Sequence, residues 1–326
     1  MKNALIVYNG FLNAAGPPAH AESFVAAAKK SGISMKAVKN DSLARALFMY
    51  APARQYHDPL PLCPSSCDFI IFWDKDVILC RILQDMGFKV FNAARPIEIC
   101  DDKALTAVEL RGKADMPETA VAPATFDNIG YTSLGFADIA AESLGFPLVV
   151  KERKGSLGQQ VYIVRDRESL LNTVIAHDRA PLLFQKFIDT SNSMRFFEDG
   201  LRAAAEASPP VFDDKKTVSC DLRIYVIGKK TASAVVRRSV SDFRANIAQG
   251  STPMAYIPTE EESLLAETAA VALGLDFCGV DIVADASGKR YLLEVNSNAG
   301  FLGFYRTHGV NIAEMILQYI IGKTRR

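Results

Sequence analysis

The stretch that decides the fold is Gly279-Val280-Asp281-Ile282-Val283-Ala284-Asp285-Ala286-Ser287-Gly288-Lys289-Arg290-Tyr291-Leu292-Leu293-Glu294-Val295-Asn296. Two apolar runs flank Ser287-Gly288, a dipeptide that is typical of a tight turn between two antiparallel strands. A two-residue loop at this dipeptide pairs residues whose numbers sum to 575, so Asp281 is expected directly opposite Glu294. Asn296 lies two residues beyond Glu294 and therefore points to the same face of the sheet.

Asp281, Glu294 and Asn296 thus supply three oxygen ligands on one face of the predicted hairpin. Two carboxylates that face each other repel by up to ~1 kcal/mol in an ordinary sheet, and a divalent cation between them turns this repulsion into binding. Mg²⁺ prefers a few carboxylate oxygens, with phosphates and waters completing its shell. The alternative is a hairpin rim whose acidic residues point to solvent. Acidic residues placed inside apolar runs, away from the turn, favour the metal site.

Residues 1–95 alternate short apolar runs with helical patterns. We expect strands at 4–8, 34–38, 67–73 and 89–92 and helices at 20–30 and 77–86. This alternation predicts parallel pairing with right-handed crossovers, and therefore a small open α/β domain. The segment contains neither G-x-G-x-x-G nor G-x-x-x-x-G-K, so a nucleotide would have to be held by another part of the chain.

Two further segments follow, 96–185 and 186–326. The first is expected to hold helices at 103–110, 136–144 and 167–176 and strands at 119–122, 147–151 and 161–164. The second is expected to hold strands at 221–227, 231–237, 279–284 and 290–294 and helices at 261–273 and 311–321. Between 189 and 219 runs a long polar stretch, and a connection of this length is normally a functional lid, a helical insert or a disordered segment.

Several features of residues 103–188 suit a nucleotide. Lys103 begins a helix, Lys151 ends an apolar strand, and a turn of small residues runs from Gly155 to Gln160. Lysine ammonium groups neutralise phosphate charge, and the backbone N–H groups of a glycine loop add directional donors. Each feature alone is more often structural, since such a lysine commonly reaches out to solvent. Residues 181–188 are either a core strand or an edge that presents backbone groups to an adenine ring.

The composition limits the classes of function. Of 326 residues, 49% are hydrophobic and 23% charged, which is typical of a globular protein of about two domains. Lys+Arg and Asp+Glu number 37 each, so no net charge favours nucleic acid or an acidic membrane. No run approaches the roughly 18–20 apolar residues of a spanning helix, and the N-terminus does not read as a signal peptide. We interpret the six cysteines as reduced, structural thiols, which predicts a cytoplasmic location.

In their order along the chain, the motifs resemble the ATP-grasp superfamily and, within it, the RimK-like amino-acid ligases. The resemblance runs from about residue 95 to the end, through Asp102-Lys103-x-x-Thr106, FPLVVK, KGSLGQQV, LLFQKFI, CDLRIYVIG and the hairpin. It implies an N-terminal domain at 1–95 followed by a two-lobed ATP-grasp fold of α+β character. The central lobe would span 96–185, and the C-terminal lobe 186–326 would carry the metal site and an insertion at about 189–219.

The resemblance also implies roles for individual residues. ATP would be bound by Lys103, Lys151, Gly155, Ser156, Gly158, Gln185, Lys186, Ile188 and Asp221, of which Asp221 corresponds to the acid that holds the ribose hydroxyls. The magnesium ligands, usually for two ions with Mn²⁺ able to substitute, correspond to Asp281, Glu294 and Asn296. Groups for the γ-phosphate, the acyl phosphate or the substrate carboxylate correspond to Arg223, Arg237, Arg244 and Asn246.

The implied activity is that of an ATP-dependent carboxylate–amine ligase, which forms an amide through an acyl phosphate and releases ADP and phosphate. The expected substrates are small-molecule or peptide carboxylates and amines, with a carrier protein and a homo-oligomer left open and no nucleic acid or membrane expected. Two alternatives stay open: a ligase with a thiol or carrier-protein acceptor, and a non-catalytic nucleotide-binding regulatory module. Because the insertion at 189–219 could reshape the acceptor pocket, substrate identity does not transfer from relatives.

Overall fold

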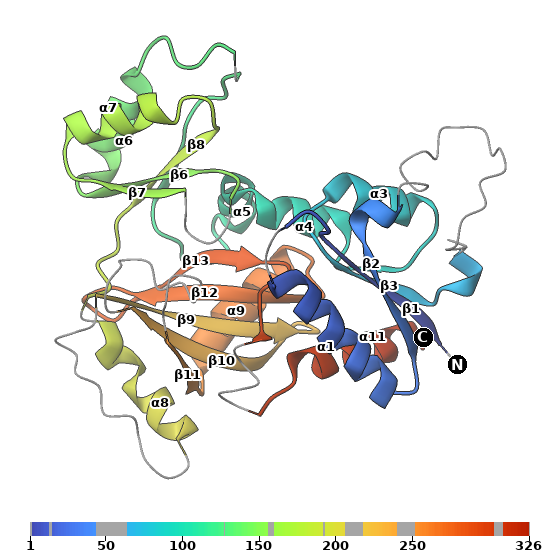
Figure 1. Ribbon diagram of the computed structural model, residues 1–326. Helices are drawn as coiled ribbons and strands as arrows, with labels where there is room; N and C mark the ends of the chain where they lie inside the picture. The colour runs from blue at the N-terminus through green and yellow to red at the C-terminus, as the bar shows by residue number, and fades with distance from the viewer. Residues whose placement is uncertain are drawn as a thin grey trace.

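The structure is a computed structural model that describes residues 2–12, 15–43, 64–126, 128–155, 160–191, 193–205, 218–239, 252–302 and 309–325. It contains three sheets, each with its own helices. Figure 1 shows the sheet of β6, β7 and β8 as an upper lobe above the five-stranded sheet of β9 to β13, with the N-terminal sheet beside them. The mixed α/β class expected from the sequence is confirmed.

The N-terminal sheet is parallel, as the alternation of strands and helices predicts, with the order β2-β1-β3-β4. Its strands are β1 (Asn3–Tyr8), β2 (Ser34–Lys39), β3 (Phe69–Trp73) and β4 (Val90–Phe91), with the 3₁₀ turns η1 (Asn40–Leu43) and η2 (Pro64–Ser66) between β2 and β3. The helix α1 (Gly16–Lys30) packs on one face and α3 (Val77–Asp85) on the other. All five residues of β3 are therefore buried, which is usual where helices cover both faces of a parallel sheet.

Two short helices, α4 (Ala94–Asp101) and α5 (Lys103–Leu110), follow this sheet. The sequence analysis predicts α5 but not α4, because Pro96 is a residue that normally interrupts a helix. Pro96 stands in the first turn of α4, where no intrahelical N–H donor is needed, and it is tolerated there. Helix α4 runs across the predicted domain boundary at residue 95, and the division of the chain into domains stays a prediction.

The upper lobe is built on an antiparallel sheet with the order β5-β8-β6-β7. Its elements are β5 (Thr119–Val121), α6 (Gly135–Leu144), β6 (Leu148–Glu152), β7 (Val161–Val164), α7 (Arg167–Ala176) and β8 (Leu182–Lys186). Leu148 and Val150 are buried with residues of α6 and α7, whereas Val149 and Lys151 line a cavity on the opposite face. The strand period of two thus separates the core of this lobe from a ligand-accessible face.

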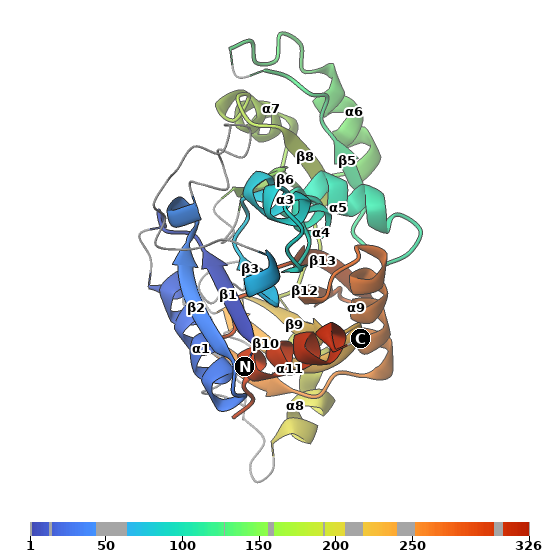
Figure 2. The same cartoon turned by 90° about the vertical axis from the view of Figure 1, so that its right-hand side faces the viewer.

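The C-terminal sheet is antiparallel, with the order β11-β10-β9-β12-β13. Its strands are β9 (Ser219–Ile227), β10 (Lys230–Ser239), β11 (Thr252–Tyr256), β12 (Phe277–Ala284) and β13 (Arg290–Asn296). One face packs on α9 (Glu260–Ala272) and on the short helices η3 (Ser193–Phe197) and α8 (Glu198–Ala204). Residues of the other face share a core with α1 and α11 (Ile312–Thr324), two helices that lie side by side in Figures 1 and 2.

The polar stretch at 189–219 is partly helical. Within its described residues, η3 and α8 pack beneath the C-terminal sheet through Met194, Phe197 and Leu201. Of the three alternatives for this stretch, a helical insert therefore describes residues 193–204. Residues 206–217 lie outside the part of the chain that the structure describes.

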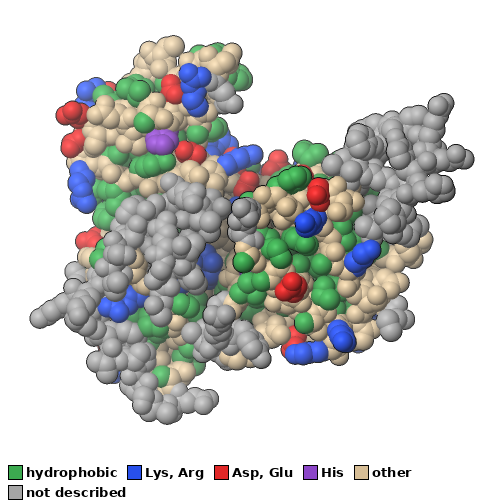
Figure 3. Space-filling view, viewed as in Figure 1, with side chains coloured by type: hydrophobic (Ala, Val, Ile, Leu, Met, Phe, Trp, Pro, Cys, Tyr) green, Lys and Arg blue, Asp and Glu red, His purple; other side chains and the backbone are tan. Residues whose placement is uncertain are grey.

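The surface and the thiols agree with the composition. Figure 3 shows acidic and basic side chains interspersed over the visible face, without a large field of one sign. Among the described helices, none is both long enough and apolar enough to cross a membrane. Among the described residues, Cys67, Cys80, Cys100, Cys220 and Cys278 form no disulfide bond, and Cys63 lies outside the described residues.

Candidate active site

A cavity of about 830 Å³ is lined by residues of all three sheets. Twelve of the sixteen predicted site residues line it: Lys103, Lys151, Gly155, Gln185, Lys186, Ile188, Asp221, Arg223, Arg237, Asp281, Glu294 and Asn296. The other four, Ser156, Gly158, Arg244 and Asn246, lie outside the described residues. Residues as far apart in the sequence as Lys103 and Asn296 are thus brought to one cavity.

The upper lobe supplies a lysine whose charge is destabilised by its surroundings. Lys151 follows the last buried residue of β6, and its Nζ donates a hydrogen bond of 2.5 Å to Oε1 of Gln185 on β8. Burial lowers the pKa of Lys151 to about 8; nearby Glu294 opposes this shift, and Lys103 adds to it. A polyanion in the cavity would stabilise the charged form of Lys151, because it supplies negative charge close to the ammonium group.

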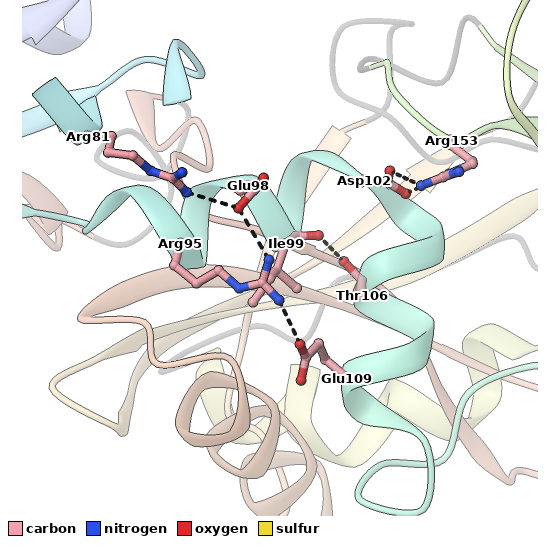
Figure 4. A network of polar contacts seen from close by, with 8 residues as sticks. All are labelled: Arg81, Arg95, Glu98, Ile99, Asp102, Thr106, Glu109 and Arg153. Carbon is pink, nitrogen blue, oxygen red and sulfur yellow. Dashed lines mark hydrogen bonds and ion pairs between the residues drawn. The ribbon is translucent and has the colours of Figure 1, made fainter. Parts of the chain in front are cut away.

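The second lysine is held in place by a neighbouring ion pair. Asp102 caps α5 by accepting hydrogen bonds from the N–H groups of Ala104 and Leu105, at 2.9 and 3.2 Å. The same carboxylate binds the guanidinium of Arg153 in two-point fashion, at 2.5 and 3.1 Å (Figure 4). Burial raises the pKa of Asp102, but the Arg153 guanidinium and the backbone donors outweigh this effect and hold the pKa below its usual value.

This ion pair joins the two segments that carry the cavity lysines. The backbone N–H of Lys103 donates to the carbonyl of Arg153 at 2.9 Å, and Nζ of Lys103 donates to the carbonyl of Gly155 at 3.1 Å. Arg153 itself follows Lys151 by two residues. The start of α5, the end of β6 and the start of the glycine loop are therefore tied together, which fixes the relative position of both lysines.

Figure 4 also shows a second group of contacts on the outer side of α4 and α5. Arg95 binds Glu98 and Glu109 at 3.2 and 3.0 Å, and Arg81 of α3 approaches Glu98 at 3.6 Å. These side chains are a third to more than half exposed, so each pair stabilises the fold by well under ~1 kcal/mol. They orient α3, α4 and α5 relative to one another and lie away from the cavity lining.

Four alternating charges form the wall of the cavity on the C-terminal sheet. Arg237 binds Asp221, its direct cross-strand partner, at 2.6 and 2.5 Å. Arg223 binds its own partner Asp281 at 2.7 and 2.6 Å, and Arg237 also reaches Asp281 at 3.0 Å. Burial raises the pKa of Asp281, but the two guanidinium groups hold it below its usual value. The arginines are thus fixed at the cavity by two-point bonds that leave other N–H groups available.

The hairpin that carries the predicted metal ligands contains two irregularities that cancel. The prediction of a two-residue loop is wrong: the N–H of Asp285 bonds to the carbonyl of Lys289, which leaves a three-residue loop ending at Gly288 with φ of +90°. A β-bulge then adds one residue to β13, between the pairs Ile282–Leu292 and Asp281–Glu294. Asp281 and Glu294 therefore face each other as predicted, and Leu293 and Glu294 both line the cavity.

Two of the three predicted metal ligands are not used by the fold. Among the described residues, Glu294 makes no ion pair, and the buried Nδ2 atom of Asn296 has no hydrogen-bond partner. In the part of the chain that the structure describes, no group of three His, Cys, Asp or Glu residues lies close enough to hold a metal. This donor set fits Mg²⁺, which takes few protein carboxylates and completes its shell with water and phosphate oxygens.

The N-terminal sheet and helix α1 contribute cavity residues that the sequence analysis does not identify. Asn9 follows β1, Asp74 follows β3, and both line the cavity together with His20 and Trp73. Ligands of open α/β sheets bind at the carboxyl ends of the parallel strands, and this rule could have identified Asn9 and Asp74 from the sequence. His20 of α1 contacts the segment that follows β13, since its Nε2 accepts the N–H of Phe301 at 3.2 Å.

Curated proteins are similar to this chain over about three quarters of its length. The chain is 28% identical to human β-citrylglutamate synthase B over 249 residues, which are 76% of this chain and 56% of that protein. It is 34% identical to a probable α-L-glutamate ligase of Parasynechococcus marenigrum (strain WH8102) over 245 residues, 74% of this chain and 45% of that protein. The chain thus spans about half the length of the curated relatives it matches.

A solved structure and a family model complete the comparison. D-alanine–D-alanine ligase from Bacillus anthracis superposes with a TM-score of 0.69 at 15% identity, over all of this chain and 98% of that one, which shows a common fold. The model of the RimK-like ATP-grasp domain matches residues 105–202 and 212–320, well over half of the chain. The chain therefore belongs to the RimK-like ATP-grasp family.

Proposed function

We propose that this protein is an ATP-dependent carboxylate–amine ligase, which forms an amide bond through an acyl phosphate and releases ADP and phosphate. The observation that carries the proposal is the composition of the cavity. Lys103 and Lys151 line it together with Arg223 and Arg237, which are fixed by aspartates, and with Glu294, which makes no ion pair among the described residues. Family membership and relatives that are named synthases and ligases support it.

The nucleotide would bind between the upper lobe and the C-terminal sheet. Lys103, Lys151 and the loop with Gly155, Ser156 and Gly158 are assigned to its phosphates. The strand end with Gln185, Lys186 and Ile188 is assigned to adenine, for which Val149, Val283 and Leu293 supply apolar cavity walls. Asp221 is assigned to the ribose hydroxyl groups, since its carboxylate has acceptor capacity beyond its two bonds to Arg237.

Asp281, Glu294 and Asn296 would hold Mg²⁺, with two ions proposed and Mn²⁺ as a substitute. When bound, the metal neutralises charge on the phosphate oxygens. Asp281 is already oriented by Arg223 and Arg237, so its carboxylate does not need to be ordered when the nucleotide enters. Glu294 makes no ion pair among the described residues, so its carboxylate is available to a metal. Asn296 would add its side-chain oxygen.

Catalysis would depend on placement and charge stabilisation. The donor carboxylate attacks the γ-phosphorus of ATP and ADP leaves; the amine then attacks the acyl carbon and phosphate leaves. Phosphoryl transfer needs little covalent help from the protein, and pre-positioned cations lower its barrier. Arg223 and Arg237, fixed in the cavity wall, are assigned to the negative charge that develops in both steps. Arg244 and Asn246 are assigned to the same role.

The substrates proposed are a small-molecule or peptide carboxylate and an amine. A thiol or carrier-protein acceptor and a regulatory module without catalysis are less favoured, since the relatives are named a β-citrylglutamate synthase and a probable α-L-glutamate ligase. A homo-oligomer and a cytoplasmic location stay predictions from the sequence.

Hydroxylamine trapping tests this function directly. The protein is incubated with Mg-ATP, hydroxylamine and a panel of amino acids, N-acylated amino acids and small polycarboxylates. We expect ADP and an acyl hydroxamate to appear in equal amounts with at least one carboxylate. Binding of Mg-ATP without ADP or hydroxamate under any carboxylate would identify a regulatory module instead. ADP formation that responds to thiols and not to amines would identify the thiol-acceptor ligase.

A further inference from the structure

Buried carboxylates in the described part of the chain differ in how their charge is neutralised. Five Asp or Glu residues are less than 9% exposed, and four of them are bound by an arginine guanidinium. The four pairs are Asp102 with Arg153, Asp221 with Arg237, Asp281 with Arg223, and Glu262 with Arg290. The fifth, Asp74, differs from all of these.

Asp74 is 5% exposed and has no basic side chain in contact among the described residues. Its carboxylate accepts the N–H of Lys75 at 2.7 Å and the Nδ2 group of Asn9 at 3.2 and 3.4 Å. The ammonium of Lys75 binds Asp101 instead, at 2.8 Å. Burial accordingly raises the pKa of Asp74. A buried carboxylate without a cation is costly, unless a ligand brings the cation.

Asp74 is held in an orientation that suits a ligand. Strands β1 and β3 are neighbours, and the pair Tyr8–Trp73 brings the next residues, Asn9 and Asp74, together at the edge of the sheet. Oδ1 of Asn9 accepts the N–H groups of Phe11 and Leu12, at 2.9 and 3.1 Å, so its amide nitrogen is the atom left to face Asp74. Asn9, Trp73 and Asp74 all line the cavity that holds the proposed nucleotide site.

We propose that Asp74, held in its orientation by Asn9, binds a primary ammonium group of a substrate. A carboxylate offers about four acceptor positions, and the hydrogen bonds from Lys75 and Asn9 use three of them, so one position on Oδ2 can accept an ammonium N–H group. The substrate class is therefore an amino acid or another carboxylate or amine with a free ammonium group. This inference rests on the proposed ligase function.

The ammonium group has two sources, and the experiment separates them. It belongs either to the carboxylate donor, as an amino group that does not react, or to the acceptor in its charged form before deprotonation. Asp74→Asn keeps the shape of the side chain and removes its charge. Asp76→Asn is the matched control in the same turn, because Asn retains the cap that Asp76 provides to α3 and this residue does not line the cavity.

KM for the carboxylate donor and KM for the amine acceptor are both measured by ADP release. Hydroxylamine serves as the acceptor when the donor is varied. If the ammonium belongs to the donor, Asp74→Asn raises KM for an amino acid by about 10- to 100-fold, as expected for a charge-assisted hydrogen bond. KM for the same acid without its amino group then stays within twofold. If the ammonium belongs to the acceptor, KM for the amine rises by the same factor and hydroxamate formation is unchanged. Asp76→Asn should match the unmutated protein in every arm.

Equal KM values for Asp74→Asn and the unmutated protein would overturn the inference, as would an equal rise for the amino and des-amino donors. If Asp74→Asn does not fold, Asn9→Ala, which frees the carboxylate from its fixed orientation, is expected to raise the same KM by a smaller factor. Failure of the ligase function is a separate outcome, seen as no ADP with any carboxylate. In that case amino acids should still raise Tm of the unmutated protein and not of Asp74→Asn, and no such rise would overturn the ammonium site.

Discussion

Removal of the Asp102 side chain should weaken the fold and the nucleotide site together. Asp102→Ala abolishes the cap of α5, which costs about 1 kcal/mol of the free energy of unfolding. It also leaves Arg153 without its partner. Loss of one partner of a fully buried pair costs ~3–5 kcal/mol, but the Arg153 side chain is 25% exposed and water solvates it in part, so we expect about 1–3 kcal/mol. The total is about 2–4 kcal/mol.

Asp102→Asn separates the two effects, because asparagine caps a helix as well as aspartate but does not form the ion pair. It should therefore be about 1 kcal/mol more stable than Asp102→Ala. Urea unfolding followed by circular dichroism measures both, with equal m-values as the check that the same transition is compared. Both variants should raise KM for ATP, since Lys103 follows directly. An Asn variant as stable as the unmutated protein, or losses from Asp102→Asn and Arg153→Gln that add in the double variant, would refute the assignment.

Three further results are expected. Glu294→Ala should abolish ADP formation and leave the circular dichroism spectrum intact, because Glu294 makes no described ion pair that supports the fold; full activity at limiting Mg²⁺ would exclude it as a ligand. Since the pKa of Lys151 is about 8 without nucleotide and phosphate favours its charged form, ATP binding at pH 8 should take up about half a proton, and affinity should fall as the pH rises further. Titration calorimetry in buffers of different ionisation enthalpy measures this uptake, and none between pH 7.5 and 9 would contradict it. Gly279→Ala would place its Cβ 2.5 Å from that of Ala299 and should cost about 1–3 kcal/mol in thermal unfolding, whereas Gly135→Ala, with open space, should match the unmutated protein.

The sequence predicts most elements of the fold because apolar periodicity and turn residues are local signals. Strand β7 and helix α7 have the predicted bounds, and β2 differs by one residue. The elements not predicted are α4, α8 and β11. A proline near the start of α4, and the polar surroundings of α8, remove the local signal, so these elements depend on tertiary packing.

The register of the C-terminal sheet was less accessible to sequence reasoning. Gly228 and Lys229 form a two-residue turn, both with positive φ, and a regular ladder from this turn would place Val236 opposite Asp221. A bulge between Thr231 and Ser233 shifts the register by one residue, so Arg237 takes that place and faces the cavity. The alternation of apolar and polar residues in the sequence does not reveal a bulge. The sequence therefore indicated the charged residues, and the structure showed that they pair.

The cavity residues Asn9 and Asp74 of the N-terminal sheet were missed for a different reason. That Asn9 and Asp74 follow strands is visible in the sequence, and so is the general rule that ligands bind at such ends. What the sequence does not show is that this edge of the sheet faces the same cavity as Lys103 and Lys151, because that depends on how three sheets pack. The contacts of α1 with α11, from opposite ends of the chain, set this arrangement.

The extra residue in β13 has a consequence for how such sites change during evolution or design. With Leu293 removed, Asp281 and Glu294 would still face each other along an uninterrupted ladder, and the sheet would come closer to ideal geometry. Only the apolar side chain beside the carboxylate would be lost from the cavity. The proposed ion ligands and the proposed apolar wall for the base can therefore diverge through a single-codon deletion. An idealised backbone would keep the facing carboxylates and lose the apolar wall.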